Sequence, residues 1–346
     1  MRQLLRLTKH WDTACFPWSP LASKLLPTFA AAHIEFRPLQ LAAINLAQSG
    51  YSLFLNWPTG AGKSLCFQLP ALLQDAKNSP THRITLVISP LKSLVHDQIQ
   101  HLERMQLAHA VKRLASQDIP QLHHLDGVSL LYATPEILLQ NQDAAQLIMQ
   151  LYECNRLERL VVDEAHCVLE WGNTFRPAYM KLAQLRARKM GNIPVTLLTA
   201  TASEHAIQML AQSFGVEQIA LPEPKHLGNN DEEQQKRANA HELVVLRQIS
   251  DRANLKLKIL PKHEVVVQNM LGIVKIIRNE PAIVYTLTKN EAEEVAKGLS
   301  KVGCRVQAYH AGMSDAARKR VQQQWMSGKI STICATVAFG VRYTFY

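Results

Sequence analysis

Residues 56–64, NWPTGAGKS, combine small residues with a lysine and a hydroxyl group in an order that suits phosphate binding. Gly62, Lys63 and Ser64 match the end of the pattern G-x-x-x-x-G-K-[ST], but Trp57 stands where its first glycine belongs. Small residues let backbone N–H groups turn toward phosphate oxygens at a helix N-terminus, where the helix dipole also favours anions. Lys63 would reach the β- and γ-phosphates, and the Ser64 hydroxyl would ligate Mg²⁺. The nucleotide-binding residues expected in this loop are Thr59, Gly60, Ala61, Gly62, Lys63 and Ser64.

Two adjacent carboxylates, Asp163 and Glu164, end the apolar run of VVDEAH (161–166). A carboxylate at the carboxyl end of a parallel strand faces the crevice in which ligands bind. Asp163 can hold Mg²⁺, and Glu164 can orient or deprotonate an attacking water. Paired acids alone usually form a solvated turn. About 100 residues after a glycine-lysine-serine loop, they indicate a site for phosphate chemistry.

Two further stretches add polar groups near these loops. TLLTATAS (196–203) ends in hydroxyl residues, of which Thr199 and Thr201 could hydrogen-bond the acidic site and sense the γ-phosphate. FRPLQ (36–40) carries Arg37 and Gln40, and an amide can both donate to and accept from an adenine edge. The alternatives are a strand-end cap for the threonines and a plain helix start for FRPLQ.

The elements that must position these residues alternate between strand and helix. Helical patterns at 64–76 and 93–106 lie between short apolar runs of strand length. This alternation predicts a parallel sheet with helices on both faces. The predicted strands are 52–56, 84–89, 128–133, 159–163 and 195–200.

The alternation breaks after residue 220, where 222–242 is polar and without apolar periodicity, as in a linker or mobile loop. A second α/β unit follows, with strands at 281–286, 305–310 and 330–336 and helices at 290–302 and near 315–327. The predicted parts are an N-terminal extension (1–28), a first domain (29–220), a linker or loop (221–250) and a partial second domain (251–346).

Composition narrows the class of protein. The 346 residues suffice for two domains with cores of their own. The net charge of +10 and the pI near 9.3 indicate either binding to a polyanion such as nucleic acid or a basic surface that is merely solvated. No segment approaches the eighteen or so apolar residues that span a bilayer, and the N-terminus does not resemble a secretory signal, so we expect no membrane partner and a cytoplasmic location.

The six cysteines form no CxxC pair, which argues against a zinc ribbon or a disulfide framework.

Taken together, the motifs resemble those of superfamily 2 helicases, and most closely the RecQ family of DNA helicases, from about Phe29 to Gly340. The blocks that carry the resemblance are FRPLQ, WPTGAGKSLCFQLPALL, VISPLKSLVHDQI, LLYATPEILL, VVDEAHCVLEWG–FRPAY, LTATAS, YHAGMS and ATVAFG. The family's own phosphate loop also lacks the first glycine.

The resemblance implies an α/β fold of two RecA-like P-loop domains with parallel sheets, the second incomplete. It implies ATP and Mg²⁺ as cofactors and 3′-to-5′ movement on single-stranded or partly duplex DNA, in repair or recombination. The catalytic residues would be Lys63, Asp163, Glu164 and His166, with Ser64 and Asp163 on the metal.

The same resemblance assigns DNA contacts. Pro90 and Lys92 of SPLKS and Thr134 of ATPE would touch the DNA backbone. Members of the family carry an aromatic-rich loop after the acidic box, in which bases stacked on aromatic side chains report bound DNA to the ATP site. The loop residues expected to sense DNA are Trp171, Phe175 and Arg176, and the alternative is that the aromatic residues simply pack between domains. In the second domain Tyr285, His310 and Thr336 would stand at matching positions.

Two departures from the family pattern affect this hypothesis. The usual WGHDFRP has Asn173 and Thr174 in place of its histidine and aspartate, which weakens the expected coupling of DNA binding to hydrolysis. After ATVAFG the sequence is VRYTFY, without the arginine-rich motif that stabilises charge on the γ-phosphate, so we expect a truncated chain or a protein partner that supplies the arginine.

Three functions remain open at this point. The first is an ATP-dependent DNA helicase. The second is a nucleotide- and DNA-binding remnant that does not unwind efficiently. The third is an RNA helicase of the related DExH class, against which the aromatic loop argues.

Overall fold

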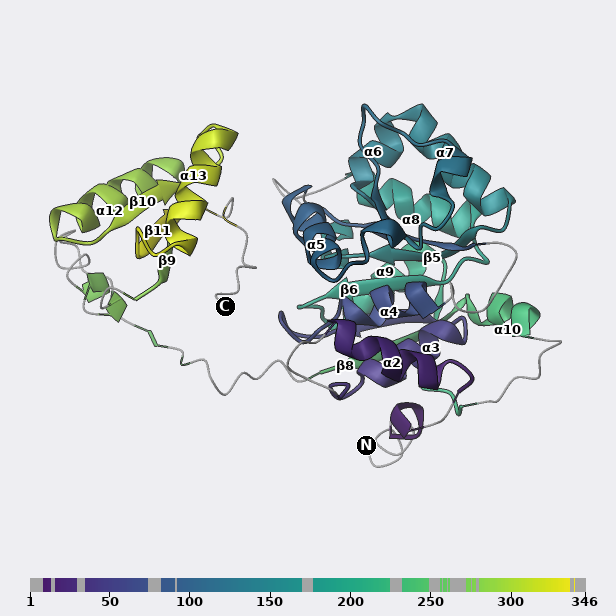
Figure 1. Cartoon of the computed structure of the whole chain (residues 1–346). Coiled ribbons are helices and arrows are strands. Elements are labelled where there is room, and N and C mark those ends of the chain that lie inside the picture. The colour runs from purple at the N-terminus through teal and green to yellow at the C-terminus, as the bar shows by residue number, and fades with distance from the viewer. Residues whose placement is uncertain are drawn as a thin grey trace. The chain divides into compact units, whose positions relative to one another are not determined.

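The computed structural model divides into two compact units, Met1–Asp251 and Arg252–Tyr346, which are considered separately (Figure 1). The structure describes residues 9–13, 16–29, 35–73, 82–90, 92–169, 177–224, 232–248, 256, 258–259, 261, 272–274, 276–277, 280–336 and 339.

The first unit is built on an eight-stranded sheet in the order β3-β4-β2-β5-β6-β1-β8-β7, in which every strand pair is parallel. Its strands are β1 (Ser52–Asn56), β2 (Ile84–Ile88), β3 (Val111–Arg113), β4 (Leu130–Ala133), β5 (Leu157–Val162), β6 (Val195–Thr199), β7 (Glu217–Ile219) and β8 (Glu242–Arg247). Strands such as β2 are buried along their whole length, which is typical of a parallel sheet covered on both faces. The parallel α/β fold predicted from the alternation is confirmed.

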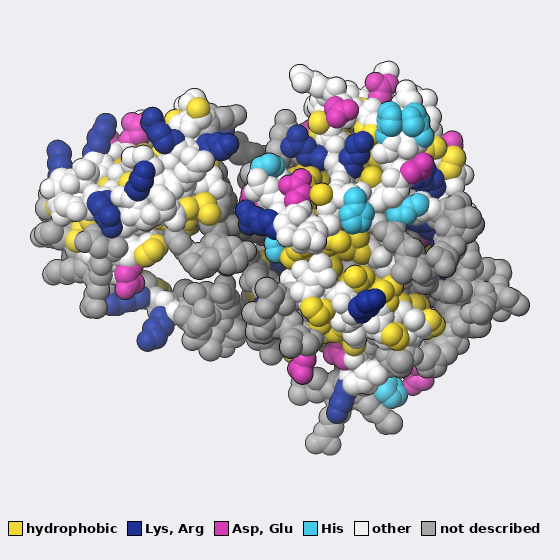
Figure 2. Space-filling model, in the orientation of Figure 1, with side chains coloured by type: hydrophobic (Ala, Val, Ile, Leu, Met, Phe, Trp, Pro, Cys, Tyr) yellow, Lys and Arg dark blue, Asp and Glu magenta, His cyan; other side chains and the backbone are white. Residues whose placement is uncertain are grey.

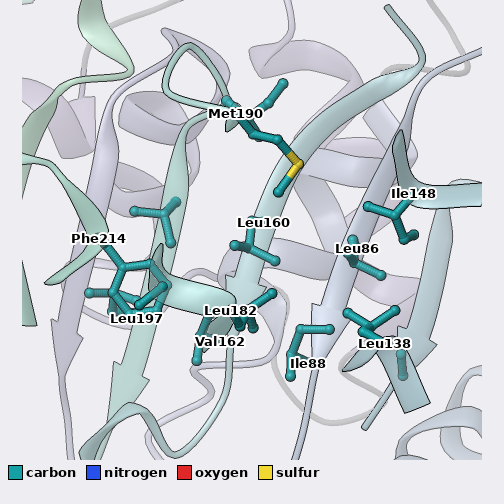
Figure 3. Close-up of a cluster of buried hydrophobic side chains, with 14 of the residues drawn as sticks. Leu86, Ile88, Leu138, Ile148, Leu160, Val162, Leu182, Met190, Leu197 and Phe214 are labelled. Atoms are coloured by element: carbon teal, nitrogen blue, oxygen red, sulfur yellow. The ribbon is translucent and has the colours of Figure 1, made fainter. Parts of the chain in front are cut away.

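Helices cover both faces of this sheet (Figure 1). One face carries α2 (Ser19–Phe29), α3 (Gln40–Gln48), α4 (Leu65–Leu73) and α5 (Lys92–Arg104). The other carries α6 (Pro135–Gln140), α7 (Gln142–Glu153), α8 (Pro177–Lys189) and α9 (Glu204–Phe214). Successive strand residues face opposite sides, so Val161 lies in one core and Leu160 and Val162 in the other. Figure 3 shows side chains of β2, β5 and β6 meeting Leu138, Ile148, Leu182, Met190 and Phe214 from the second of these faces.

Two buried arginines tie the layers together. Arg186 of α8 is fully buried and donates to the carbonyl oxygens of Ile193, Phe214, Gly215 and Ala240 at 2.7–3.1 Å. Backbone carbonyls thus replace the lost hydration of the guanidinium, although burial still lowers its pKa to about 10. Arg159 of β5 bonds in the same way to Ala47 O and Tyr51 O and to the Thr196 hydroxyl.

The segment predicted as an N-terminal extension adds to the first core. Trp11, Phe16 and Trp18 are buried, and their rings stack in sequence at centroid distances of 5.5 and 4.9 Å. Trp11 Nε1 donates to Pro222 O at 2.6 Å, which joins this segment to residues 211 positions later.

The expectation of a linker or loop over 221–250 is wrong for much of that range. Residues Glu232–Asn239 form α10, whose Lys236 lies directly against Gly50, and β8 is largely buried between β1 and β7. The polar sequence of α10 has no apolar periodicity because a short helix at the edge of a unit has little face to bury.

The second unit contains a three-stranded parallel sheet in the order β10-β11-β9. The elements of this unit include β9 (Ala282–Tyr285), α12 (Lys289–Lys301), β10 (Val306–Tyr309), α13 (Asp315–Met326) and β11 (Thr332–Ala335). Thr288 and Glu291 form a reciprocal capping box at the start of α12. Its small cores gather around Leu299 and Trp325. In the described part of the chain, no helix is long and apolar enough to cross a membrane.

Candidate active site

The carboxyl edge of the first sheet gathers most of the predicted site residues, because all its strands run in the same direction. The glycine-lysine-serine loop follows β1, the acidic pair follows β5, and Thr199 ends β6 between them. Pro90 follows β2, and Thr134 follows β4.

The loop from Pro58 to Ser64 has the geometry of a phosphate cradle. Gly60 and Gly62 both have φ of +81°, a conformation that glycine adopts without strain. The backbone N–H groups of Gly60, Gly62 and Ser64 have no acceptor among the described residues, and α4 begins immediately afterwards. Unpaired donors at a helix N-terminus suit an anion, so the residues present fit a nucleotide phosphate.

Lys63 is folded into the same loop. Its side chain is only 7% exposed, and Nζ donates to the carbonyl oxygens of Trp57 at 2.6 Å and Pro58 at 3.2 Å. These bonds offset the cost of burying an ammonium group. A bound phosphate would compete with the two carbonyls for this charge.

Arg37 and Gln40 brace the loop from outside. Arg37 Nη1 donates to Gly60 O at 2.6 Å, and Gln40 Nε2 donates to Gly62 O at 3.2 Å. The side-chain oxygen of Gln40, Oε1, accepts from Arg37 N at 2.8 Å, so both ends of the side-chain amide are hydrogen-bonded. Gln40 is only 4% exposed. The two residues predicted to read the adenine therefore lie beside the predicted phosphate site.

The acidic pair sits on a strained turn. Glu164 has φ of +52° and ψ of +47°, the left-handed region that a side chain other than glycine enters at a cost of about 1–2 kcal/mol. Its N–H is fixed by the Asp163 carboxylate at 3.0 Å, and Asp163 O accepts from the Tyr179 hydroxyl at 3.2 Å. Strain of this kind concentrates at functional sites, since the surrounding structure must maintain it.

A chain of polar contacts joins the acidic turn to β6. Glu164 Oε2 lies 3.4 Å from His166 Nδ1, and that nitrogen lies 3.0 Å from Thr199 Oγ1. Thr199 Oγ1 donates to Thr201 O and accepts from Thr201 N. Thr201 thus takes part through its backbone, whereas its side chain had been expected to make the contact.

Trp57, which replaces the first glycine of the pattern, is a structural residue. The indole is fully buried, and Nε1 donates to Leu246 O of β8 at 3.0 Å. Sequence reasoning treated this position only as a missing glycine. A large aromatic residue directly after a buried strand was the available signal that the side chain fills a core.

The residues predicted to contact DNA are only partly described. Thr134 is 5% exposed and Pro90 is buried, so both lie within the edge of the sheet. Lys92 begins α5. Trp171, Phe175 and Arg176 of the predicted sensor, with Asn173 and Thr174, lie outside the described residues.

The second unit places its three predicted residues along one edge as well. Tyr285 ends β9, and His310 and Thr336 directly follow β10 and β11. His310 Nε2 lies 3.2 Å from Glu293 Oε1, and the Tyr285 hydroxyl donates to Phe339 O at 3.1 Å. Residues 289–329 carry eight Lys and Arg against four Asp and Glu, and basic side chains gather on the visible face of α12 and α13 (Figure 2).

Comparison of the chain with known proteins identifies its family. The family model for the DEAD/DEAH box helicase matches residues 37–210, which span the braced phosphate loop, the acidic turn and β6. The chain belongs to the DEAD/DEAH box helicase family. Relatives of the chain include the ATP-dependent helicase SGS1 of Saccharomyces cerevisiae, 35% identical over 97% of the chain and 22% of the yeast protein. The putative ATP-dependent DNA helicase Q1 of Caenorhabditis elegans is 35% identical over 97% of the chain and 50% of the worm protein.

These relatives are RecQ-family ATP-dependent DNA helicases, which confirms the resemblance found in the motifs. The chain spans between about one fifth and one half of the length of the curated relatives it matches. Among solved structures, Mycobacterium smegmatis helicase Lhr bound to single-stranded DNA and AMP-PNP aligns with 94% of this chain and 42% of its own, at a TM-score of 0.59 and 19% identity. S. cerevisiae Dbp5 bound to RNA and ADP BeF3 aligns with 92% of the chain and 74% of its own, at a TM-score of 0.60 and 14% identity. These two likenesses show the fold alone.

Proposed function

We propose that this chain is the motor of a RecQ-type helicase, which couples ATP hydrolysis to 3′-to-5′ movement on single-stranded DNA in repair or recombination. The observation that carries the proposal is the contact chain from Glu164 through His166 to Thr199. It links Glu164, the residue that would act on water, to Thr199 at the strand end next to the phosphate loop, so a change in the position of one would shift the other.

The loop and the acidic turn divide the chemistry between them. The N–H groups of Gly60, Gly62 and Ser64, which have no acceptor in the part of the chain that the structure describes, and the ammonium of Lys63 would bind the phosphates and neutralise charge that develops on them. Mg²⁺, held by the Ser64 hydroxyl and the Asp163 carboxylate, would screen the phosphate oxygens. The Glu164 carboxylate would orient the attacking water and accept its proton.

DNA is the expected polyanion for three reasons. The chain carries a net charge of +10, its second unit presents basic side chains around α12 and α13, and its relatives are named DNA helicases. Contacts to phosphates set affinity without reading sequence, which suits a motor that must step along any strand.

Steady-state ATPase, measured with and without single-stranded DNA, tests the proposal. The expected result is turnover that DNA stimulates and that Lys63→Ala abolishes, with strand separation on a substrate bearing a 3′ single-stranded tail. ATP binding without turnover would replace the motor with the nucleotide- and DNA-binding remnant. Stimulation by RNA in place of DNA would favour the DExH RNA helicase.

A further inference from the structure

Helix α3 starts without a cap of its own. The residue at its N-cap is Leu39, which has φ of +68° and no side chain that can accept a hydrogen bond. Of its nine residues all but Leu41 are buried, so water cannot readily reach the first N–H groups. Uncapped donors in such a place are costly, and an acceptor must come from elsewhere.

That acceptor is Asp12, from a segment 30 residues earlier in the chain. Asp12 Oδ1 accepts from Ala42 N at 3.0 Å, and the nearby backbone of Leu39 also favours the charged carboxylate, which lowers its pKa against the larger effect of burial. An aspartate bonded to the third helical N–H makes the contact of a normal N-cap, but from a distant part of the sequence. Its negative charge also suits the positive end of the helix dipole.

The position of Asp12 is fixed on both sides. Trp11 O accepts from Asn45 Nδ2 at 2.8 Å, and Trp18 Nε1 donates to Asn45 Oδ1 at 2.8 Å. Asn45 lies on α3 itself, one turn after the capped N–H. The segment is therefore clamped along the first two turns of this helix.

The capped turn is also the turn that braces the phosphate loop. Gln40 is the first residue of α3 and holds Arg37 N with its carbonyl and Gly62 O with its amide. Arg37 in turn holds Gly60 O. If the cap were lost, the turn from Arg37 to Gln40 could fray and both bonds to the loop would weaken.

We propose that Asp12 is a positioning residue for the nucleotide site, acting through the start of α3 on Arg37 and Gln40. The inference rests on the proposed function, because it requires that the loop bind ATP. It assigns to the N-terminal segment a role in nucleotide affinity and in the choice of base.

The test compares four variants with the wild-type chain. Asp12→Ala removes the cap, whereas Asp12→Asn keeps a side-chain acceptor of nearly equal capping strength. Trp11→Phe loosens the segment at Pro222 but leaves the Asp12 carboxylate in place. Thr13→Ala is the control at the neighbouring position, since among the described residues the Thr13 hydroxyl bonds only to Lys9 O of its own segment. Calorimetry gives the Kd of AMP-PNP and of the corresponding guanine analogue, and thermal unfolding gives Tm.

The expected result is that Asp12→Ala binds AMP-PNP about three- to tenfold more weakly and discriminates less between adenine and guanine, as loss of a cap predicts. Asp12→Asn and Thr13→Ala should retain wild-type affinity, and hydrogen exchange at the Ala42 amide should rise in Asp12→Ala alone.

Two results would overturn the inference and leave the proposed function standing. One is wild-type affinity in Asp12→Ala. The other is a loss of AMP-PNP affinity that is proportional to the fall in Tm in both Asp12→Ala and Trp11→Phe. That result would mean that the segment affects nucleotide binding only by stabilising the fold. A wild-type chain that binds no nucleotide would overturn both proposals together.

Discussion

The imidazole Nδ1 of His166 lies 3.0 Å from Oγ1 of Thr199, and this contact joins the ends of β5 and β6. The Thr199 hydroxyl donates its proton to Thr201 O, so it faces the ring as an acceptor. This pattern is consistent with a ring that carries its proton on Nδ1, where it also faces Glu164 Oε2. The threonine therefore orients the histidine that neighbours the expected base.

Thr199→Val should slow hydrolysis more than it weakens nucleotide binding. The substitution keeps the volume but removes the hydroxyl that lies 3.0 Å from His166 Nδ1, a loss of about 1–3 kcal/mol at this part-buried contact. DNA-stimulated ATPase should fall about tenfold or more, while the Kd of AMP-PNP stays within about twofold. Ser213→Ala, which removes an exposed hydroxyl bonded to Met209 O, is the control. Equal turnover in the two variants would contradict the assigned role of Thr199.

Trp57→Gly should damage the protein, although it completes the phosphate-loop pattern. The substitution empties a fully buried site and removes the bond to Leu246 O, which should lower the unfolding free energy by about 3–5 kcal/mol. Trp57→Phe should cost less, about 1–2 kcal/mol, because mainly the hydrogen bond is lost. Urea unfolding measures both values. A Trp57→Gly variant as stable as wild type would show that the indole is dispensable.

Gly62→Ala and Gly60→Ala distinguish the effect of backbone strain from that of a steric clash with Gln40. Both residues have φ of +81°, so each substitution should cost about 1 kcal/mol of backbone strain. At Gly62 the new Cβ would also lie 2.3 Å from Gln40 Nε2, whereas at Gly60 nothing lies within 4 Å. Gly62→Ala should therefore show the larger fall in Tm and the larger rise in the Kd of AMP-PNP. The reverse order would mean that Gln40 does not brace the loop.

Asp12→Asn should change how stability depends on pH. Burial raises the pKa of the Asp12 carboxyl above its usual 3.8, against the lowering effect of the bond from Ala42 N and of the Leu39 backbone. Between 3.8 and the raised pKa the folded chain binds the proton more tightly than the unfolded chain, so this group's contribution to stability falls as pH rises through that window. Above the window Asp12→Asn should be as stable as wild type or slightly more so. Urea titrations of both proteins from pH 4 to 8 measure the difference.

Sequence predicted the strands that carry the chemistry because they are short, continuous apolar runs that end in recognisable motifs. The residues predicted for β1, β2, β5 and β6 all lie within or beside the observed strands. By contrast, β3 and β7 have three residues each and leave no periodic signal. The strand β8 was hidden because the polar α10 precedes it and suggested a linker.

Contacts between distant residues were the other part that sequence could not reveal. From sequence alone, a single arginine such as Arg186 would be expected at the surface. The fold shows that it is buried and that backbone carbonyl oxygens such as those of Phe214 and Ala240 accept its hydrogen bonds. Asp12 likewise has no motif, because its partner on α3 is found only when the segment is placed. The role predicted for the aromatic loop stays a prediction, since Trp171, Phe175 and Arg176 lie outside the described residues.

The place of β1 between β6 and β8 has a consequence for biosynthesis. The strand that leads into the phosphate loop acquires its second neighbour only when residues about 190 positions later have been made, as the bond from Trp57 to Leu246 illustrates. At about 5–20 residues per second, translation leaves one edge of β1 open for about 10–40 seconds. An unpaired hydrophobic strand edge invites wrong pairing during that interval. Until β8 has been made, the strand that leads into the phosphate loop is therefore a place where the nascent chain can mispair.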